Sequence, residues 1–186
     1  MDRGTECYRR FLAGEEDGLA EIIRDYKDGL ILYLNSFVNN VHDAEALAED
    51  TFVRLAVKKP RDRQSAGFKT WLYTIGRNVA IDHLRRQKRT RTVPLEEVPE
   101  QASDRDALER SYIREERRIL VHRAMAKLKP DFRQVLWLVY FEGFSLREAA
   151  GIMGKSPHAA ESLVWRARQA LKEVLIQEGY SHEELP

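Results

Sequence analysis

The sequence has a single cysteine, few prolines and glycines, and no long apolar run. Cys7 has no partner in the chain for an internal disulfide, so a reducing compartment such as the cytoplasm is its expected environment. With only 10 glycines and 6 prolines in 186 residues, a loop-rich β architecture is disfavoured. No stretch approaches the ~20 apolar residues of a transmembrane helix, and the first ten residues lack the apolar segment of a secretory signal. We therefore expect a helical protein with no membrane span.

The sequence also lacks the motifs that enzymes and metal sites require. Its histidines, at positions 42, 83, 122, 158 and 182, show no metal-ligand spacing with one another or with the cysteine. No glycine-rich phosphate loop follows a predicted strand, and no serine or cysteine lies in a nucleophile motif. We therefore expect no catalytic residue, no metal, no cofactor and no small-molecule substrate.

Charge is distributed unevenly along the chain, although the net charge is only +1. Residues 61–91 hold nine Lys or Arg and two acidic residues, a local charge of +7. Residues 92–116 hold eight acidic residues and three arginines, a local charge of −5, and include two prolines. This pattern indicates a basic segment suited to nucleic acid, followed by a flexible acidic linker.

The residues from 68 to 91 are predicted to form a helix with two different faces. Apolar residues recur at helical spacing between Phe68 and Val79, so one face requires a core. A second stripe carries only hydroxyl, amide, carboxylate and guanidinium groups, at Thr74, Asn78, Asp82, Arg85 and Arg89. Such a helix with a cationic end suits DNA, and a solvated helix with a basic C-terminus favoured by its dipole is the alternative.

Two helices are predicted before this segment. Glu15–Asp17 open the first, which runs to Val38 and contains Gly29, a residue that weakens a helix by about 1 kcal/mol relative to alanine. The second is predicted to start with Asp43 as its N-cap and to end at Lys58–Pro60. Its outer face is acidic, which on its own indicates no more than a solvated surface.

The C-terminal part of the chain has the pattern of a helix-turn-helix. A helix is predicted from about residue 103 to 128, and the apolar run 132–141 is predicted to be a buried helix. Ser145–Glu148 is a capping box, Gly154 suits a left-handed turn, and Ser156–Pro157 can open a longer helix with a polar, cationic face. An ordinary αα-hairpin is the alternative to DNA binding here.

Taken together, these stretches resemble the extracytoplasmic-function (ECF) group of bacterial RNA polymerase sigma factors, over roughly residues 15–175. The stretch DAEALAEDTFVRL resembles the helix that docks on the β′ clamp of the polymerase. FKTWLYTIGRNVAIDHLRR resembles the helix that opens and reads the −10 promoter element, and residues 128–175 resemble the module that reads the −35 element. The chain departs from the family pattern at Glu49, where Gln is common, and at Glu161 and Leu163, where Lys and Arg are common.

The resemblance implies an all-α fold of two small helical domains. These would be a sigma-2-like bundle at residues 1–91 and a sigma-4-like helix-turn-helix domain at 117–186, joined by a flexible acidic linker at 92–116. The protein would bind RNA polymerase core, through the β′ clamp and the β flap, and promoter DNA in the cytoplasm, without catalysing a reaction. Family members are often held inactive by an anti-sigma factor. A stand-alone helix-turn-helix regulator is the alternative, and a helical protein-interaction module is a third interpretation.

The resemblance also implies three sets of site residues. The polymerase-binding residues would be Glu45, Glu49, Asp50 and Phe52. The residues that contact the −10 element (the −10 residues) would be Arg63, Ser65, Phe68, Lys69, Thr74, Arg77, Asn78, Asp82, Arg85, Arg86 and Arg89. The −35 residues would be Ser156, His158, Ala159, Glu161, Ser162, Trp165, Arg166 and Arg168.

Overall fold

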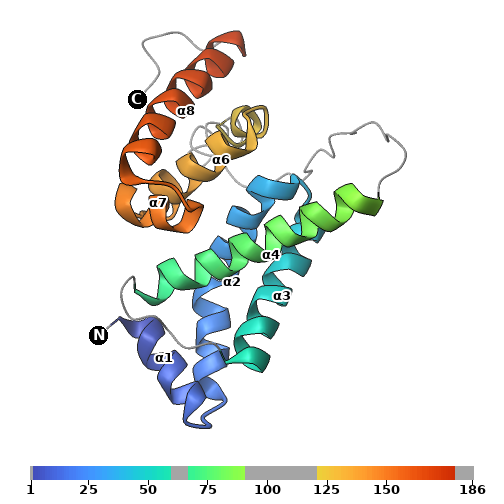
Figure 1. The fold of residues 1–186 in the computed structure, drawn as a ribbon, viewed down its shortest axis with the longest axis vertical. Coiled ribbons are helices and arrows are strands. Elements are labelled where there is room, and N and C mark those ends of the chain that lie inside the picture. Colours follow the sequence, from blue (N-terminus) through green and yellow to red (C-terminus); the bar gives the residue numbers. More distant parts are fainter. Residues whose placement is uncertain (1, 60–66, 91–120, 179–186) are drawn as a thin grey trace, which may run out of the picture.

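The computed structural model describes residues 2–59, 67–90 and 121–178, and within these ranges all regular secondary structure is helical (Figure 1). An N-terminal bundle contains α1 (Arg3–Leu12), α2 (Asp17–Val38), α3 (Val41–Lys58) and α4 (Phe68–Thr90). A C-terminal bundle contains a helical segment at 121–126, α6 (Pro130–Leu136), the π-helix η1 (Trp137–Phe141), α7 (Leu146–Met153) and α8 (Pro157–Gln177). The all-α fold expected from the sequence is confirmed. The acidic linker and the loop 61–67, apart from Gly67, lie outside the described residues.

The N-terminal bundle forms because α2, α3 and α4 each carry a periodic apolar face. Leu30, Leu34, Leu55 and Leu72 from these three helices are fully buried between them. α2 ends at Asn39, whose left-handed conformation (φ 53°) lets its N–H donate to the Asn35 carbonyl at 2.8 Å. None of the described helices is long and apolar enough to cross a membrane.

Two features of this bundle differ from the sequence prediction. α3 begins at Val41, because Asn40 is its N-cap and the Asn40 side chain accepts a hydrogen bond from the Asp43 N–H at 3.2 Å. Asp43 was predicted as the cap and instead lies in the first turn, where a carboxylate complements the helix dipole. Helix α1 was not predicted, although its Asp2 cap and its buried residues Cys7 and Tyr8 carry a helical signal.

The C-terminal bundle follows the predicted helix-turn-helix closely. The Ser145–Glu148 capping box is present, Gly154 is left-handed (φ 63°), and Ser156 caps α8 with Pro157 in its first turn. The apolar run is helical as expected, but its second half widens into the π-helix η1. There the Glu142 N–H donates to the Trp137 carbonyl, five residues back, at 3.1 Å.

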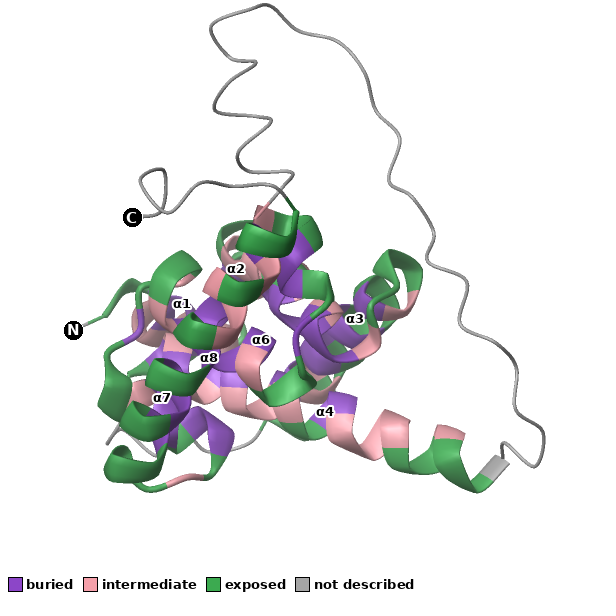
Figure 2. Ribbon diagram, turned by 90° about the horizontal axis from the view of Figure 1, so that it is seen from above, coloured by how far each residue is buried: buried purple, intermediate pink, exposed green. Residues whose placement is uncertain are grey.

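The two bundles contact each other. α4 packs against α7, and α2 packs against α6 and η1, so one apolar cluster runs through both bundles (Figure 2). The rings of Tyr73 in α4 and Phe144 before α7 lie edge to face with their centroids 5.1 Å apart. The sequence predicted two helical domains joined by a linker and carried no sign of a contact between them.

Candidate nucleic-acid interface

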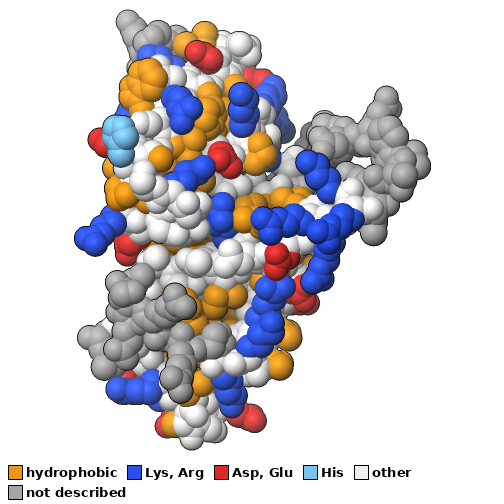
Figure 3. Space-filling model, viewed as in Figure 1, with side chains coloured by type: hydrophobic (Ala, Val, Ile, Leu, Met, Phe, Trp, Pro, Cys, Tyr) orange, Lys and Arg blue, Asp and Glu red, His pale blue; other side chains and the backbone are white. Residues whose placement is uncertain are grey.

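The C-terminal half of α4 forms a basic surface on the N-terminal bundle. Arg85, Arg86, Lys88 and Arg89 are exposed along it, and Figure 3 shows Lys and Arg side chains gathered at this end of the helix. Ile81 and Leu84 are partly exposed between them and line a shallow groove with the stems of the basic residues. A cationic ridge with apolar surface between its charges suits a nucleic-acid strand, whose phosphates and bases require both.

The polar stripe of α4 lies at the surface, as predicted. Asn78 is exposed in the middle of the stripe, with the half-buried Thr74 and Asp82 one turn away on either side. The Thr74 hydroxyl donates to the Thr70 carbonyl at 2.8 Å, and the Asp82 carboxylate lies 3.7 Å from the Arg54 guanidinium. The exposed Asn78 side chain is therefore better placed to meet a base than the half-buried Thr74 and Asp82 on either side.

The N-terminal end of α4 is held by α1. Asp2 accepts hydrogen bonds from the Gly4 N–H at 3.1 Å and from the Phe68 N–H at 2.9 Å, so one carboxylate caps both helices. The Tyr8 ring packs edge to face on Trp71 at 5.2 Å. A side chain at Gly4 would collide with Phe68, because a Cβ there would lie 2.4 Å from the ring. The start of α4 is therefore fixed to α1 by a hydrogen bond and by close aromatic packing.

Not every predicted −10 residue reaches the surface. Phe68 is fully buried among Tyr8, Tyr26 and Trp71, so its ring belongs to the core rather than to a DNA contact. Arg77 is half-buried. The predicted residues Arg63 and Ser65 lie outside the described part of the chain.

The outer face of α8 presents every residue that was predicted to read the −35 element. Ser156, His158, Ala159, Glu161, Ser162, Trp165, Arg166 and Arg168 are all exposed. Trp165 is 64% exposed, which is unusual for so large an apolar ring. The opposite face of α8, including Ala160, Leu163 and Ala167, is buried, so the helix is fixed on the bundle with its polar face outward.

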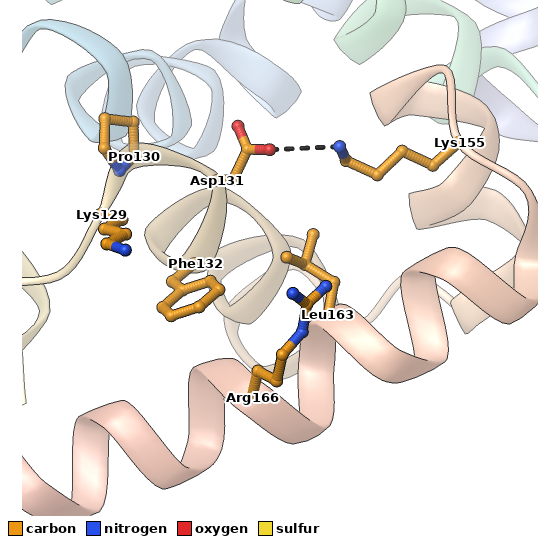
Figure 4. A pocket seen from close by; sticks show the side chains of 7 residues that line it. All are labelled: Lys129, Pro130, Asp131, Phe132, Lys155, Leu163 and Arg166. Carbon is orange, nitrogen blue, oxygen red and sulfur yellow. Dashed lines mark ion pairs between the residues drawn. The ribbon is translucent and has the colours of Figure 1, made fainter.

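Beside α8 lies a hollow of about 410 Å³ that the sequence analysis did not identify (Figure 4). Lys129, Asp131, Lys155 and Arg166 are among its lining residues. Lys155 pairs with Asp131 at 3.1 Å, which leaves Lys129 and Arg166 as cations at its edge. The sequence places one lysine beside the start of the helix at Pro130 and the other beside the Gly154 turn. Only the tertiary fold brings these two lysines to the same hollow.

The outer face of α3 combines acidic and apolar residues. Glu45, Glu49 and Asp50 are exposed, as predicted, whereas Phe52 is only 6% exposed and packs in the core. Two further residues on this helix, Val53 (57% exposed) and Val57 (76% exposed), are exposed and were not among the predicted site residues. Exposed aliphatic residues next to carboxylates on a rigid helix are typical of a protein-binding surface with a basic partner.

Comparison with known proteins identifies the class of the two bundles. Residues 22–90 match the family described as "Sigma-70 region 2", and residues 118–171 match "Sigma-70, region 4". The chain therefore has the two conserved regions of a sigma-70-type transcription factor. α4 lies within the first match, α7 and most of α8 lie within the second, and α1 lies outside both.

Several ECF sigma factors are similar to the chain over most of its length. The ECF RNA polymerase sigma factor SigW of Bacillus subtilis is 28% identical over 170 residues, which cover 87% of this chain and 91% of the relative. The ECF RNA polymerase sigma factor SigC of Mycobacterium tuberculosis is 31% identical over 136 residues, 73% of this chain and 72% of the relative. The solved structure of the sigma factor RpoE from Bartonella quintana, in complex with the anti-sigma factor NepR, matches with a TM-score of 0.67 and 26% identity, covering 84% of this chain and 95% of that one. The chain belongs to the ECF group of bacterial sigma factors.

Proposed function

We propose that this ECF sigma factor binds RNA polymerase core and places two separate helices on one promoter, α4 on the −10 element and α8 on the −35 element. The observation that carries the proposal is that each of the two regions exposes a polar and cationic helix face while burying the other face. Sigma factors are in general not enzymes, and the polymerase would supply the chemistry in the cytoplasm. No cofactor, metal or small-molecule substrate enters the proposal.

On the −35 side, α8 would lie in the major groove of duplex DNA. His158, Glu161 and Ser162 stand along the first two turns of its exposed face, near base edges, with Arg166 and Arg168 near phosphates or guanine. A carboxylate at Glu161 repels phosphate but accepts well from cytosine N4, so this position favours a cytosine in the element. Lys129, at the edge of the hollow beside α8, is placed to add a phosphate contact.

On the −10 side, α4 would act on DNA whose strands have separated. Asn78 is exposed on the polar stripe and offers an amide to a base. The exposed Arg85, Arg86, Lys88 and Arg89 would hold the backbone, each phosphate contact adding about 0.9 to the slope of log K against log salt for duplex and about 0.7 for single strands.

The outer face of α3 would dock on the β′ clamp of the polymerase, and the C-terminal domain on the β flap. Its carboxylates provide charge complementarity to a basic partner, while Val53 and Val57 provide apolar contact area. An anti-sigma factor is a further partner in this proposal, because the similar RpoE structure is a complex with one.

The decisive experiment is run-off transcription with purified core polymerase, with and without the protein. Promoter-specific transcripts only in its presence support the proposal. A palindromic duplex bound by a dimer, with no effect on core polymerase, would instead favour the stand-alone regulator.

Asn78→Ala should reduce promoter opening while leaving binding to core intact, and equal loss of both would point to misfolding. Glu49→Lys with Asp50→Lys should abolish co-purification with core, and unimpaired co-purification would contradict the assignment of α3.

A further inference from the structure

One buried carboxylate connects the two regions of the protein. Glu142 lies at the end of η1, and its side chain is 10% exposed. Its Oε2 accepts a hydrogen bond from the Tyr73 hydroxyl at 2.7 Å and lies 2.9 Å from Nζ of Lys69, both on α4. The same Nζ donates to the Glu142 backbone carbonyl at 2.8 Å. Burial, and then the charge of Glu142, raises the pKa of Tyr73 far above its ordinary value, so the phenol remains a hydrogen-bond donor at physiological pH.

A second set of contacts surrounds this carboxylate. The Thr70 hydroxyl of α4 donates to Oε1 of Glu148 at 3.3 Å, while Oε2 of Glu148 closes the capping box of α7. The Lys69 ammonium lies 4.8 Å from the centre of the Phe144 ring. The N-terminal half of α4 is therefore bound through charge, hydrogen bonds and ring contacts by the segment of region 4 that runs from η1 to α7.

Gly29, in the middle of α2, provides the space for this arrangement. A Cβ at position 29 would lie 2.7 Å from the Tyr73 hydroxyl and 2.9 Å from Oε1 of Glu142. Both distances are too short for a carbon atom, so alanine would displace the pair. The glycine weakens α2 as an isolated helix, and the contact between the two regions gives a physical reason for its presence.

We propose that these contacts form an intramolecular latch, made by Lys69, Thr70 and Tyr73 on one side and Glu142, Phe144 and Glu148 on the other, with Gly29 beneath. The latch holds region 4 against region 2 in the free protein, and it must open before both regions engage a promoter. This inference rests on the proposed function, because it assigns the N-terminal half of α4 a second occupant that competes with DNA. The ammonium of Lys69, a predicted −10 residue, is engaged by Glu142, so a phosphate at this position would have to compete with that carboxylate.

The dimensions of a promoter require the latch to open. The −35 and −10 elements lie, by their names, about 25 base pairs apart, which is about 85 Å of B-form duplex at a rise of about 3.4 Å per base pair. In the latched protein α4 contacts α7, and α8 follows directly after the Gly154 turn. With 21 residues, α8 is itself only about 32 Å long. The 30 residues between the regions, 91–120, can span at most about 100 Å when fully extended.

Two variants open the latch without altering a residue assigned to DNA or polymerase. Glu142→Gln removes the charge and places an amide group opposite Lys69 and Tyr73, and Gly29→Ala inserts a methyl group between the partners. The matched controls are Glu173→Gln, at an exposed position of α8, and Gly151→Ala, where an added Cβ has no atom within 4 Å. Gly29→Ala also raises helix propensity, so a loss of compactness in this variant cannot be attributed to a weaker α2.

The first measurement uses the full chain without polymerase. Small-angle scattering gives the radius of gyration, and mass spectrometry gives the acylation rate of Lys69 relative to the exposed Lys27 as an internal reference. Loss of one charge-assisted hydrogen bond should shift the ratio of closed to open molecules by about ten- to a hundredfold. We expect a larger radius and faster Lys69 acylation in both variants, and wild-type values in both controls. Wild-type radius and Lys69 reactivity in Glu142→Gln and Gly29→Ala would overturn the latch.

The second measurement is affinity for core polymerase. If only open molecules bind, the apparent Kd equals the intrinsic Kd divided by the open fraction, so both variants should bind core more tightly than the controls. Unchanged affinity in variants that scatter as open molecules would overturn the claim that the latch restrains assembly. The proposed function fails separately, because it is tested by transcription with the wild-type protein, whereas scattering and acylation test the latch without polymerase.

Discussion

Replacing Asp2 should destabilise two helices at once. Its carboxylate is the N-cap of α1, through the Gly4 N–H, and also accepts from the Phe68 N–H at the start of α4. Loss of an N-cap acceptor typically costs about 1 kcal/mol, so Asp2→Ala should cost about 2 kcal/mol. For a protein of this size, a change of about 2 kcal/mol corresponds to a fall in Tm of about 4–8 °C.

Asp2→Asn should give an intermediate result, since an amide has one acceptor oxygen where the carboxylate has two. The measurement is thermal unfolding followed by circular dichroism, with Asp28→Ala, at an exposed position in the middle of α2, as the matched control. A Tm within about 1 °C of wild type for Asp2→Ala would refute the double cap. Asp2→Ala should also impair promoter opening more than binding to core, because the first turn of α4 loses its cap while the outer face of α3 is untouched.

Other predictions concern acid stability, salt dependence and the exposed valines. Hydrogen bonds from Ser145 hold the pKa of Glu148 below its ordinary value, so this carboxylate stabilises the folded protein above the unfolded pKa of about 4.3 and loses that contribution as the pH falls through the folded pKa. Tm measured against pH should therefore fall less steeply in acid for Glu148→Gln, and an unchanged acid slope would contradict this linkage. If Arg166 and Arg168 each contact a phosphate, removing either should reduce the salt slope of −35 duplex binding by about 0.9, and an unchanged slope would exclude the contact. Val57→Asp should weaken binding to core polymerase without lowering Tm, because the side chain is 76% exposed, and unaltered binding would remove this residue from the interface.

Local signals in the sequence predicted much of the fold. The capping box at Ser145, the left-handed Gly154 and the Ser156–Pro157 helix start all lie within a few residues of the structure that they specify, and all are confirmed. The N-cap of α3 was misplaced by three residues, because Asn40 and Asp43 are both good N-caps. Helix α1 was missed because it is short and its apolar residues are few, so its stability depends on packing against α2 and α4.

The candidate site was predictable where a single helix face carries it. The exposure of Asn78 on α4 and of Arg166 and Arg168 on α8 follows directly from helical periodicity. Phe68 and Phe52 were predicted as site residues through the family resemblance, but both are buried, and for Phe68 helical periodicity had already indicated the core face. The contact between the regions was beyond any local signal, since it joins Lys69 to Glu142 across more than seventy residues of chain.

Gly29 carries a practical consequence for anyone who engineers this protein. A routine search for thermostabilising substitutions would choose this glycine early, since alanine strengthens an exposed or half-buried helix by about 1 kcal/mol. At Gly29, however, the added Cβ would collide with the Tyr73 hydroxyl inside the same bundle and with Glu142 of region 4, so the substitution would disturb the proposed latch rather than simply strengthen α2. The gain in helix propensity at this position is therefore opposed by the space that the contact between the two regions requires, and glycine provides that space.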